Sequence, residues 1–158
     1  MNTYLMRRIV LILLPLLLIS CDRNVLFDQS QRVDGGGWPA SQLLRFNVEA
    51  TDTTSRYLCC IDLRNELDYP FSNIYLSIKT VYPDGSFSAD TNIEFILAQP
   101  DGKWLGRQTA RYVDGRYPFA YFQFPRPGAY QFVLSHAMRD SLLPGIRDVG
   151  LHIEKMSD

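Results

Sequence analysis

The chain has 158 residues, and its sixteen Lys and Arg nearly balance its seventeen Asp and Glu. Arg7 and Arg8 carry the only charged side chains before Cys21, so residues 21–158 hold 14 basic and 17 acidic residues, a formal charge of −3. The basic residues are scattered along the chain, which excludes the clustered positive charge of a nucleic-acid-binding protein.

Residues 1–20 have the pattern of a bacterial secretion signal. Arg7 and Arg8 precede an uninterrupted apolar run of eleven residues, Ile9 to Ile19. A membrane-spanning helix needs ~20 such residues, and Pro15 further disfavours a permanent helix. The pattern therefore predicts a signal segment and not a membrane-spanning helix.

The four residues Leu18-Ile19-Ser20-Cys21 at the end of this run match a bacterial lipobox. In that motif the signal peptidase cleaves before the cysteine, and the cysteine carries the lipid. We predict a cleaved lipoprotein signal peptide over 1–20, lipidation of Cys21, and a tether over 21–34 that joins a sheet edge. Two acyl chains make such anchoring stable, whereas one is marginal. The alternative is an ordinary cleaved signal in which Cys21 is incidental.

After residue 35 the sequence alternates apolar and polar residues with the period of two that is typical of half-buried strands. Strands are predicted over 44–50, 57–64, 74–82, 91–97, 117–124, 130–138 and 149–153. Pro83-Asp84-Gly85 and Pro100-Asp101-Gly102 are turn signals, and Asp114-Gly115 is predicted as a hairpin turn between short strands. Lys103 to Gln108 does not alternate, which predicts a single helical turn or a bridging loop.

About eight or nine short strands joined by turns, with almost no helix, predict an all-β fold. We expect a single antiparallel β-sandwich, of jelly-roll or immunoglobulin-like type, over residues 35–158. A chain of this length fits one domain with a substantial core. Phe132 and Leu151 are predicted to face that core from two late strands.

No catalytic, metal-binding or cofactor-binding pattern is recognisable. His136 and His152 are the only histidines, and neither lies in a spacing typical of metal ligands. No oxyanion turn of the Gly-x-Ser-x-Gly kind occurs. Cys59 and Cys60 point to opposite faces of a strand, so a disulfide between them would be strained and two small buried residues are expected. These observations predict a protein that is not an enzyme and that uses no cofactor.

Aromatic residues make up 13% of the chain, and they gather between Trp104 and Phe124. The segment from Tyr117 to Phe124 is apolar on both faces, so both faces need a covering. A partner could cover one face, which makes Trp104, Tyr117 and Tyr121 the candidate partner-binding surface. Intramolecular coverings are the alternative, and Trp104 could instead plug the end of the sandwich and fix the crossing between its sheets.

Several segments of the chain are similar to the GldH lipoproteins of gliding motility in the Bacteroidetes. The resemblance extends from Cys21 to about Glu154, and Cys59-Cys60 is the departure from it. The segments that carry it are Gly37-Trp38, Leu63-Arg64-Asn65, Tyr69 to Leu76, Pro100 to Gly106, His136 to Arg139 and Leu143 to Leu151. The family has no assigned active site, so the resemblance assigns no catalytic residue.

The resemblance implies a part in gliding motility and in a cell envelope machinery linked to outer-membrane secretion, with envelope proteins as partners. A small-molecule ligand is not expected. A carbohydrate-binding module on a lipid anchor is the alternative, because a β-sandwich rich in Trp and Tyr could bind sugar. We expect a lipid-anchored protein of the outer membrane. Only Asp22 is acidic between Cys21 and Asp28, so we expect the periplasmic face of that membrane and not the cell surface.

Overall fold

A computed structural model describes residues 24–33 and 36–157 of the chain. The predicted signal peptide and Cys21 lie outside the described residues. Within these, no helix has the length and apolar character needed to cross a membrane. The strands are β1 Val25–Arg32, β2 Trp38–Pro39, β3 Leu44–Ala50, β4 Tyr57–Glu66, β5 Asn73–Val81, β6 Thr91–Ile96, β7 Arg107–Gln108, β8 Tyr112–Phe122, β9 Gly128–His136, β10 Leu142–Leu143 and β11 Ile146–Lys155.

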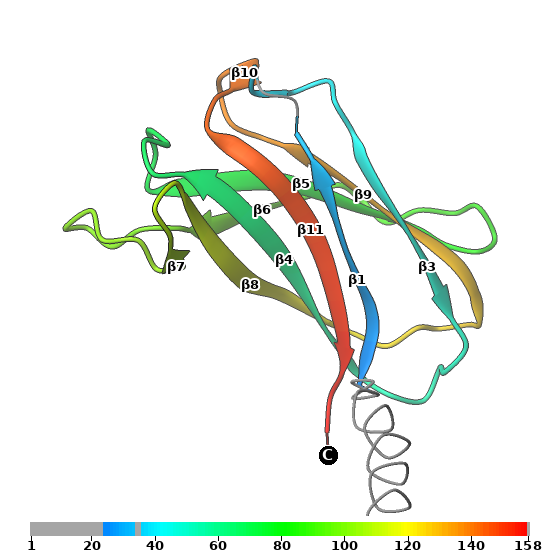
Figure 1. The fold of residues 1–158 in the computed structure, drawn as a ribbon. Coiled ribbons are helices and arrows are strands. Elements are labelled where there is room, and N and C mark those ends of the chain that lie inside the picture. Colours follow the sequence, from blue (N-terminus) through cyan, green and yellow to red (C-terminus); the bar gives the residue numbers. More distant parts are fainter. Residues whose placement is uncertain (1–23, 34–35, 158) are drawn as a thin grey trace, which may run out of the picture.

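The strands form an antiparallel β-sandwich, which confirms the predicted fold class. A five-stranded sheet has the order β1-β11-β4-β8-β7, and a four-stranded sheet has the order β3-β9-β5-β6. The two sheets lie one over the other in Figure 1, and the short pair β10-β2 lies at one end. The described residues form eleven strands, more than the eight or nine expected, because three are only two residues long.

The core lies between the two sheets and follows the predicted alternation. In β3, every second residue is buried and every residue between them is exposed. Phe132 of β9 and Leu151 of β11 are both buried, as predicted, and belong to the central cluster. β9 lies between β3 and β5, whereas β11 lies between β1 and β4. Apolar side chains of the two sheets therefore meet across the full width of the sandwich.

The polar segment after Cys21 contains a strand. β1 pairs antiparallel with β11 from Val25, opposite Glu154, to Arg32, opposite Asp148. It is the edge strand of the five-stranded sheet, and the Gln31 amide donates a hydrogen bond to the Arg45 carbonyl of β3 in the other sheet, at 2.7 Å. The strand therefore helps to close one side of the sandwich.

The prediction of a hairpin turn at Asp114-Gly115 is wrong, because both residues lie inside the long strand β8. Asp114 stands opposite Arg64 of β4, and Gly115 stands opposite Leu63. The carboxylate of Asp114 accepts two hydrogen bonds from Arg64, which favours an extended chain over a turn. Gly115 is needed here because a Cβ at this position would collide with the ring of Tyr117.

The other two predicted turns are confirmed. Gly85 and Gly102 both have positive φ, 81° and 86°, and each donates its N–H to the carbonyl three residues earlier. The second turn belongs to the connection that leads from β6 in one sheet to β7 in the other. Within this connection, Trp104 bridges to Ala98 and packs, partly buried, against the core. Trp104 thus covers the side of the sandwich opposite β1.

His136, at the end of β9, is buried without a well-formed hydrogen bond. Among the described residues, neither ring nitrogen has a partner in good hydrogen-bond geometry, and the ring packs edge-on against Trp38 with 5.4 Å between centroids. Burial lowers the pKa of His136, although the Trp38 backbone and the charge of Asp140 oppose the shift. A neutral imidazole is therefore the form that the folded protein accommodates.

This environment predicts a pH-dependent stability. Because the pKa of His136 in the folded chain lies below its ordinary 6.5, the unfolded chain binds the extra proton first as the pH falls. The contribution of neutral His136 to the stability of the fold is therefore fully present above pH ~6.5. It is lost as the pH drops from there towards the lowered pKa. We expect His136→Phe to remove this part of the pH dependence of thermal unfolding. Parallel melting curves for wild type and variant between pH 5 and 7.5 would contradict the prediction.

Candidate functional site

The outer face of the five-stranded sheet carries two adjoining groups of charged side chains. The strand period turns these residues away from the core, and the sheet register places them side by side across β1, β11, β4 and β8. We call this set the charged face; it consists of Asp28, Asp62, Arg64, Asp114, Arg116, Asp148, His152 and Glu154.

Arg116 of β8 is at the centre of the first group of ion pairs. Its Nε and Nη2 donate to the two carboxylate oxygens of Asp62, each at 2.7 Å. The same Nη2 donates to Asp28 of β1 at 3.3 Å. These carboxylates raise the pKa of Arg116, mainly through the hydrogen bonds to Asp62. The planar guanidinium thereby joins the outermost strand of the sheet to β4 and β8.

Arg64 of β4 organises a second group beside the first. Its guanidinium donates to both oxygens of Asp114, at 2.6 and 3.3 Å, and lies 3.7 Å from Asp148. The hydrogen bond from Arg64 is the main reason that the pKa of Asp114 is lowered. A hollow of about 560 Å³ lies between the two groups, lined by Ser30, Asp62, Leu63, Arg64, Asp114, Gly115, Arg116 and Asp148.

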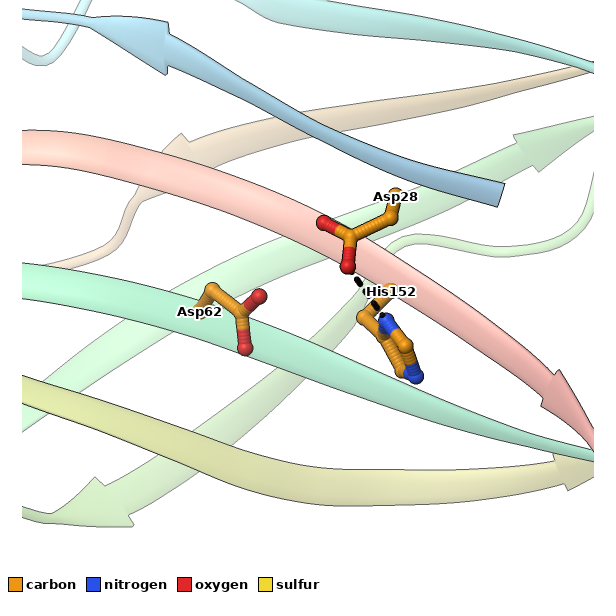
Figure 2. Close-up of side chains that lie close together, drawn as sticks. All are labelled: Asp28, Asp62 and His152. Atoms are coloured by element: carbon orange, nitrogen blue, oxygen red, sulfur yellow. Dashed lines mark hydrogen bonds and ion pairs between the residues drawn. The ribbon is translucent and has the colours of Figure 1, made fainter. Parts of the chain in front are cut away.

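His152 is the most buried member of the charged face, with 2% of its surface exposed. Its Nδ1 lies 3.0 Å from the Asp28 carboxylate, and its Nε2 lies 3.3 Å from Glu154. Figure 2 shows His152 and Asp28 in contact across β11 and β1, with Asp62 on the neighbouring strand. Both ring nitrogens therefore have carboxylate partners.

Asp28, Asp62 and His152 are of the residue types that hold a metal ion. Each offers one ligand atom, and these atoms lie within 4.8 Å of one another. However, Arg116 already donates to both carboxylates, and His152 contacts Asp28. A cation would have to displace a guanidinium that neutralises the same oxygens. The arrangement fits a structural ion-pair network better than a metal centre.

Cys60, His152 and Asp28 lie on adjacent strands, the residue types of a cysteine hydrolase triad. Cys60 stands opposite His152 in the register of β4 and β11. Such an enzyme needs a thiolate activated by the imidazole. Here Nε2 of His152 faces Glu154, and burial raises the pKa of Cys60. Burial likewise raises the pKa of Cys59 on the inner side, to about 12. Both groups are therefore thiols at neutral pH, which makes them poor nucleophiles.

The structure does not bring Trp104, Tyr117 and Tyr121 together on one surface. Tyr117 points between the sheets, where its ring packs edge-on against Phe95 of β6 at 6.2 Å between centroids. Trp104 packs against the core from the connection before β7. Tyr121 is 63% exposed on the outer face, and the Arg56 guanidinium lies 5.6 Å from its ring centroid. Only Tyr121 presents most of its surface to solvent.

Sequence reasoning missed the charged face because its members are far apart in the chain. Asp28 and His152 are separated by 124 positions, and Asp62 and Arg116 by 54. Alternation does predict that Asp62 and His152 share the outward side of their strands. The order of the strands, which decides which outward residues become neighbours, is not contained in that pattern.

Comparison with solved structures gives only a distant likeness. The VP2 subviral particle of infectious bursal disease virus aligns with a TM-score of 0.35 at 12% identity. The alignment covers 82% of this chain, which spans only 30% of the viral chain.

Comparison with sequences gives two close relatives. The gliding motility lipoprotein GldH of Flavobacterium johnsoniae is 31% identical over 155 residues, covering 92% of this chain and 94% of the relative. A GldH homolog of Christiangramia forsetii is 30% identical over 148 residues, covering 89% and 90%. The family model described as GldH lipoprotein matches residues 25–153, from the start of β1 to the end of the core of β11. The chain belongs to the GldH lipoprotein family of gliding motility.

Proposed function

We propose that this chain is a non-enzymatic lipoprotein that binds a protein partner in the gliding-motility and cell envelope machinery, linked to outer-membrane secretion, through the charged face. The observation that carries the proposal is the pair of ion-pair groups around the hollow. Their guanidinium and carboxylate groups are held by a rigid sheet while much of their surface remains exposed, between 22% and 46% for Asp62, Arg64, Asp114, Arg116 and Asp148. Such preformed charge patterns favour specific protein partners.

The chemistry of the same face supports binding over catalysis. Cys60 is a poorly activated thiol, and His152 is engaged by two carboxylates. A nucleophile and a free base held together would be needed for acyl transfer. A network whose members neutralise one another serves recognition better than proton transfer.

A carbohydrate-binding module would need a row of coplanar exposed aromatic rings on one face. Among the described residues, the aromatic side chains that are exposed to solvent are Tyr75, Phe87 and Tyr121. Tyr75 and Phe87 belong to β5 and to the loop that follows it, whereas Tyr121 lies on β8 in the other sheet. This distribution does not favour sugar binding, so protein recognition is the function we propose.

We further propose that lipid on Cys21 holds the domain at the periplasmic face of the outer membrane. The lipobox at Cys21 and membership of a lipoprotein family support the anchor. Asp22 is the only acidic residue between Cys21 and Asp28, and this lack of an acidic cluster supports the periplasmic leaflet. The partners that such a domain can contact are then the periplasmic proteins of the machinery.

Neutralising the charged face tests the proposed recognition. In a strain that lacks the gene, we expect a copy with Arg64→Gln to restore colony spreading and protein secretion only weakly. The variant removes the guanidinium that holds Asp114 and Asp148 in place beside the hollow. Truncation of a charged anchor at an interface typically costs ~2 kcal/mol or more, roughly thirtyfold in affinity.

Arg45→Gln is the matched control. Arg45 is exposed on β3, in the other sheet, and its side chain donates to Gln131 at 3.0 Å. Its variant should complement fully, with immunoblots showing equal amounts of both proteins. Full complementation by Arg64→Gln would contradict partner binding through the charged face. Turnover of a substrate by the purified protein would contradict the proposal that the protein is not an enzyme.

A further inference from the structure

One end of the sandwich carries two exposed side chains, Tyr121 and Met156, beside the start of β1. The chain begins β1 and ends β11 at the same end of the molecule (Figure 1). There the N–H of Lys155 donates to the Asn24 carbonyl at 2.7 Å, and the N–H of Met156 donates to the Arg56 carbonyl at 2.9 Å. The first bond holds Asn24 to the end of β11, and the second holds Met156 to the residue that precedes β4.

Tyr121 belongs to the same end. It stands opposite Leu58 in the register of β8 and β4, two residues from Arg56, whose guanidinium lies over the Tyr121 ring at 5.6 Å. Tyr121 is 63% exposed and Met156 is 38% exposed. We call Asn24, Arg56, Tyr121 and Met156 the anchor end.

The chain between Cys21 and the anchor end is very short. Only three peptide units separate the Cα atoms of Cys21 and Asn24. A fully extended chain spans at most about 3.6 Å per residue, so these three units span no more than about 11 Å. If Cys21 carries lipid, as the proposed function holds, Asn24 is held within that distance of the acyl-chain attachment. A tether of this length leaves no room for a partner protein between the anchor end and the bilayer.

The side chains of the anchor end fit a bilayer surface. Tyrosine is enriched at the membrane–water interface because its ring is apolar and its hydroxyl is polar. Arginine extends an apolar stem while its guanidinium remains among the headgroups, and buried apolar surface adds to the attachment. The packing of the sandwich leaves Tyr121 and Met156 exposed, so both side chains are available for contact with lipid.

We propose that the anchor end lies in the headgroup layer of the bilayer, with Tyr121 and Met156 in contact with lipid. This inference rests on the proposed lipid anchor. The sandwich then stands on the membrane with its strands pointing away from it. Leu142 of β10 lies beyond the far end of β11, whose ten residues span about 33 Å. The hollow of the charged face lies between these ends and remains open to a partner.

Quenching of a fluorescent label by nitroxide-labelled lipid tests this orientation, with the full lipidated chain. Tyr121→Cys and Met156→Cys, and the distal control Leu142→Cys, would each be labelled with a thiol-reactive NBD dye. Leu142 is 50% exposed, so the control site is as accessible as the others. Cys59 and Cys60 are buried, and lipidated Cys21 has no free thiol, so wild type gives the labelling background. The proteins would be reconstituted into phosphatidylethanolamine–phosphatidylglycerol vesicles that contain lipid with a nitroxide on its headgroup.

We expect the labels at 121 and 156 to lose most of their fluorescence and the label at 142 to lose little. Vesicle flotation, measured on the same samples, reports the anchor separately. Equal quenching at all three positions in protein that floats would overturn the orientation while leaving the lipid anchor intact. Protein that fails to float would overturn the anchor and this inference with it.

Discussion

Cys21→Ala abolishes incorporation of labelled palmitate and leaves the signal segment attached; this is the result we expect with the largest effect. The lipoprotein peptidase cuts only before a lipidated cysteine, so loss of the thiol stops both steps. Palmitate labelling and the mass of the chain from a membrane fraction measure the two outcomes. Cys60→Ala is the matched control, because it removes a buried thiol on β4 and leaves the lipobox unchanged. Continued labelling of the Cys21 variant would contradict the prediction.

Fractionation of the same cells tests where the anchor holds the domain. Wild type should sediment with outer membranes and survive protease added to whole cells, because the proposed site is the periplasmic leaflet. The same protease should digest it once the outer membrane has been permeabilised. Rapid digestion in intact cells would place the domain on the cell surface, although the lipid anchor itself would still stand.

Much of the fold follows from the sequence because most strands have one buried and one solvated face. The segment from Leu44 to Ala50 alternates without a break, and the structure has a strand with these bounds. Asp114-Gly115 misled the prediction because the same dipeptide suits a turn and an ion-paired strand. Only the position of Arg64 on β4 decides between them, and that position depends on which strands become neighbours.

The candidate site was less predictable than the fold. Arg116, Asp28 and Asp62 come from three strands, and the edge position of β1 decides that Asp28 reaches Arg116. β1 itself is half polar, so its alternation is weak and the segment resembles a tether. Tyr117 and Tyr121 both lie on β8, yet only Tyr121 points outward. A register shift between Cys59 and Cys60, where β8 inserts an extra residue, changes which side chains of this segment face the core.

Phe132→Ala is expected to cause the second large effect, a loss of stability. Phe132 is 2% exposed in the central strand β9, and its ring packs edge-on against Phe122 of the other sheet at 6.1 Å between centroids. Phe-to-Ala changes in such positions cost about 3–5 kcal/mol, because they remove buried surface and leave a cavity. Domains unfold with about 5–15 kcal/mol in total, so a large share of the stability is lost. At about 2–4 °C for each kcal/mol, the melting temperature of the soluble fragment 22–158 should fall by roughly 6–20 °C.

Tyr121→Ala is the control for Phe132→Ala. It also removes an aromatic ring, but one outside the core, so the difference between the two melting temperatures reports core packing. Tyr121 contacts Arg56 but is mostly exposed, so its truncation should shift the melting temperature by about 2 °C or less. Leu151→Ala, on β11 of the opposite sheet, should resemble Phe132→Ala, since Leu151 is fully buried and such changes cost about 2–5 kcal/mol. Equal melting temperatures for the Phe132 and Tyr121 variants would mean that the two sheets do not meet through Phe132. The core described for the sandwich would then be wrong at its centre.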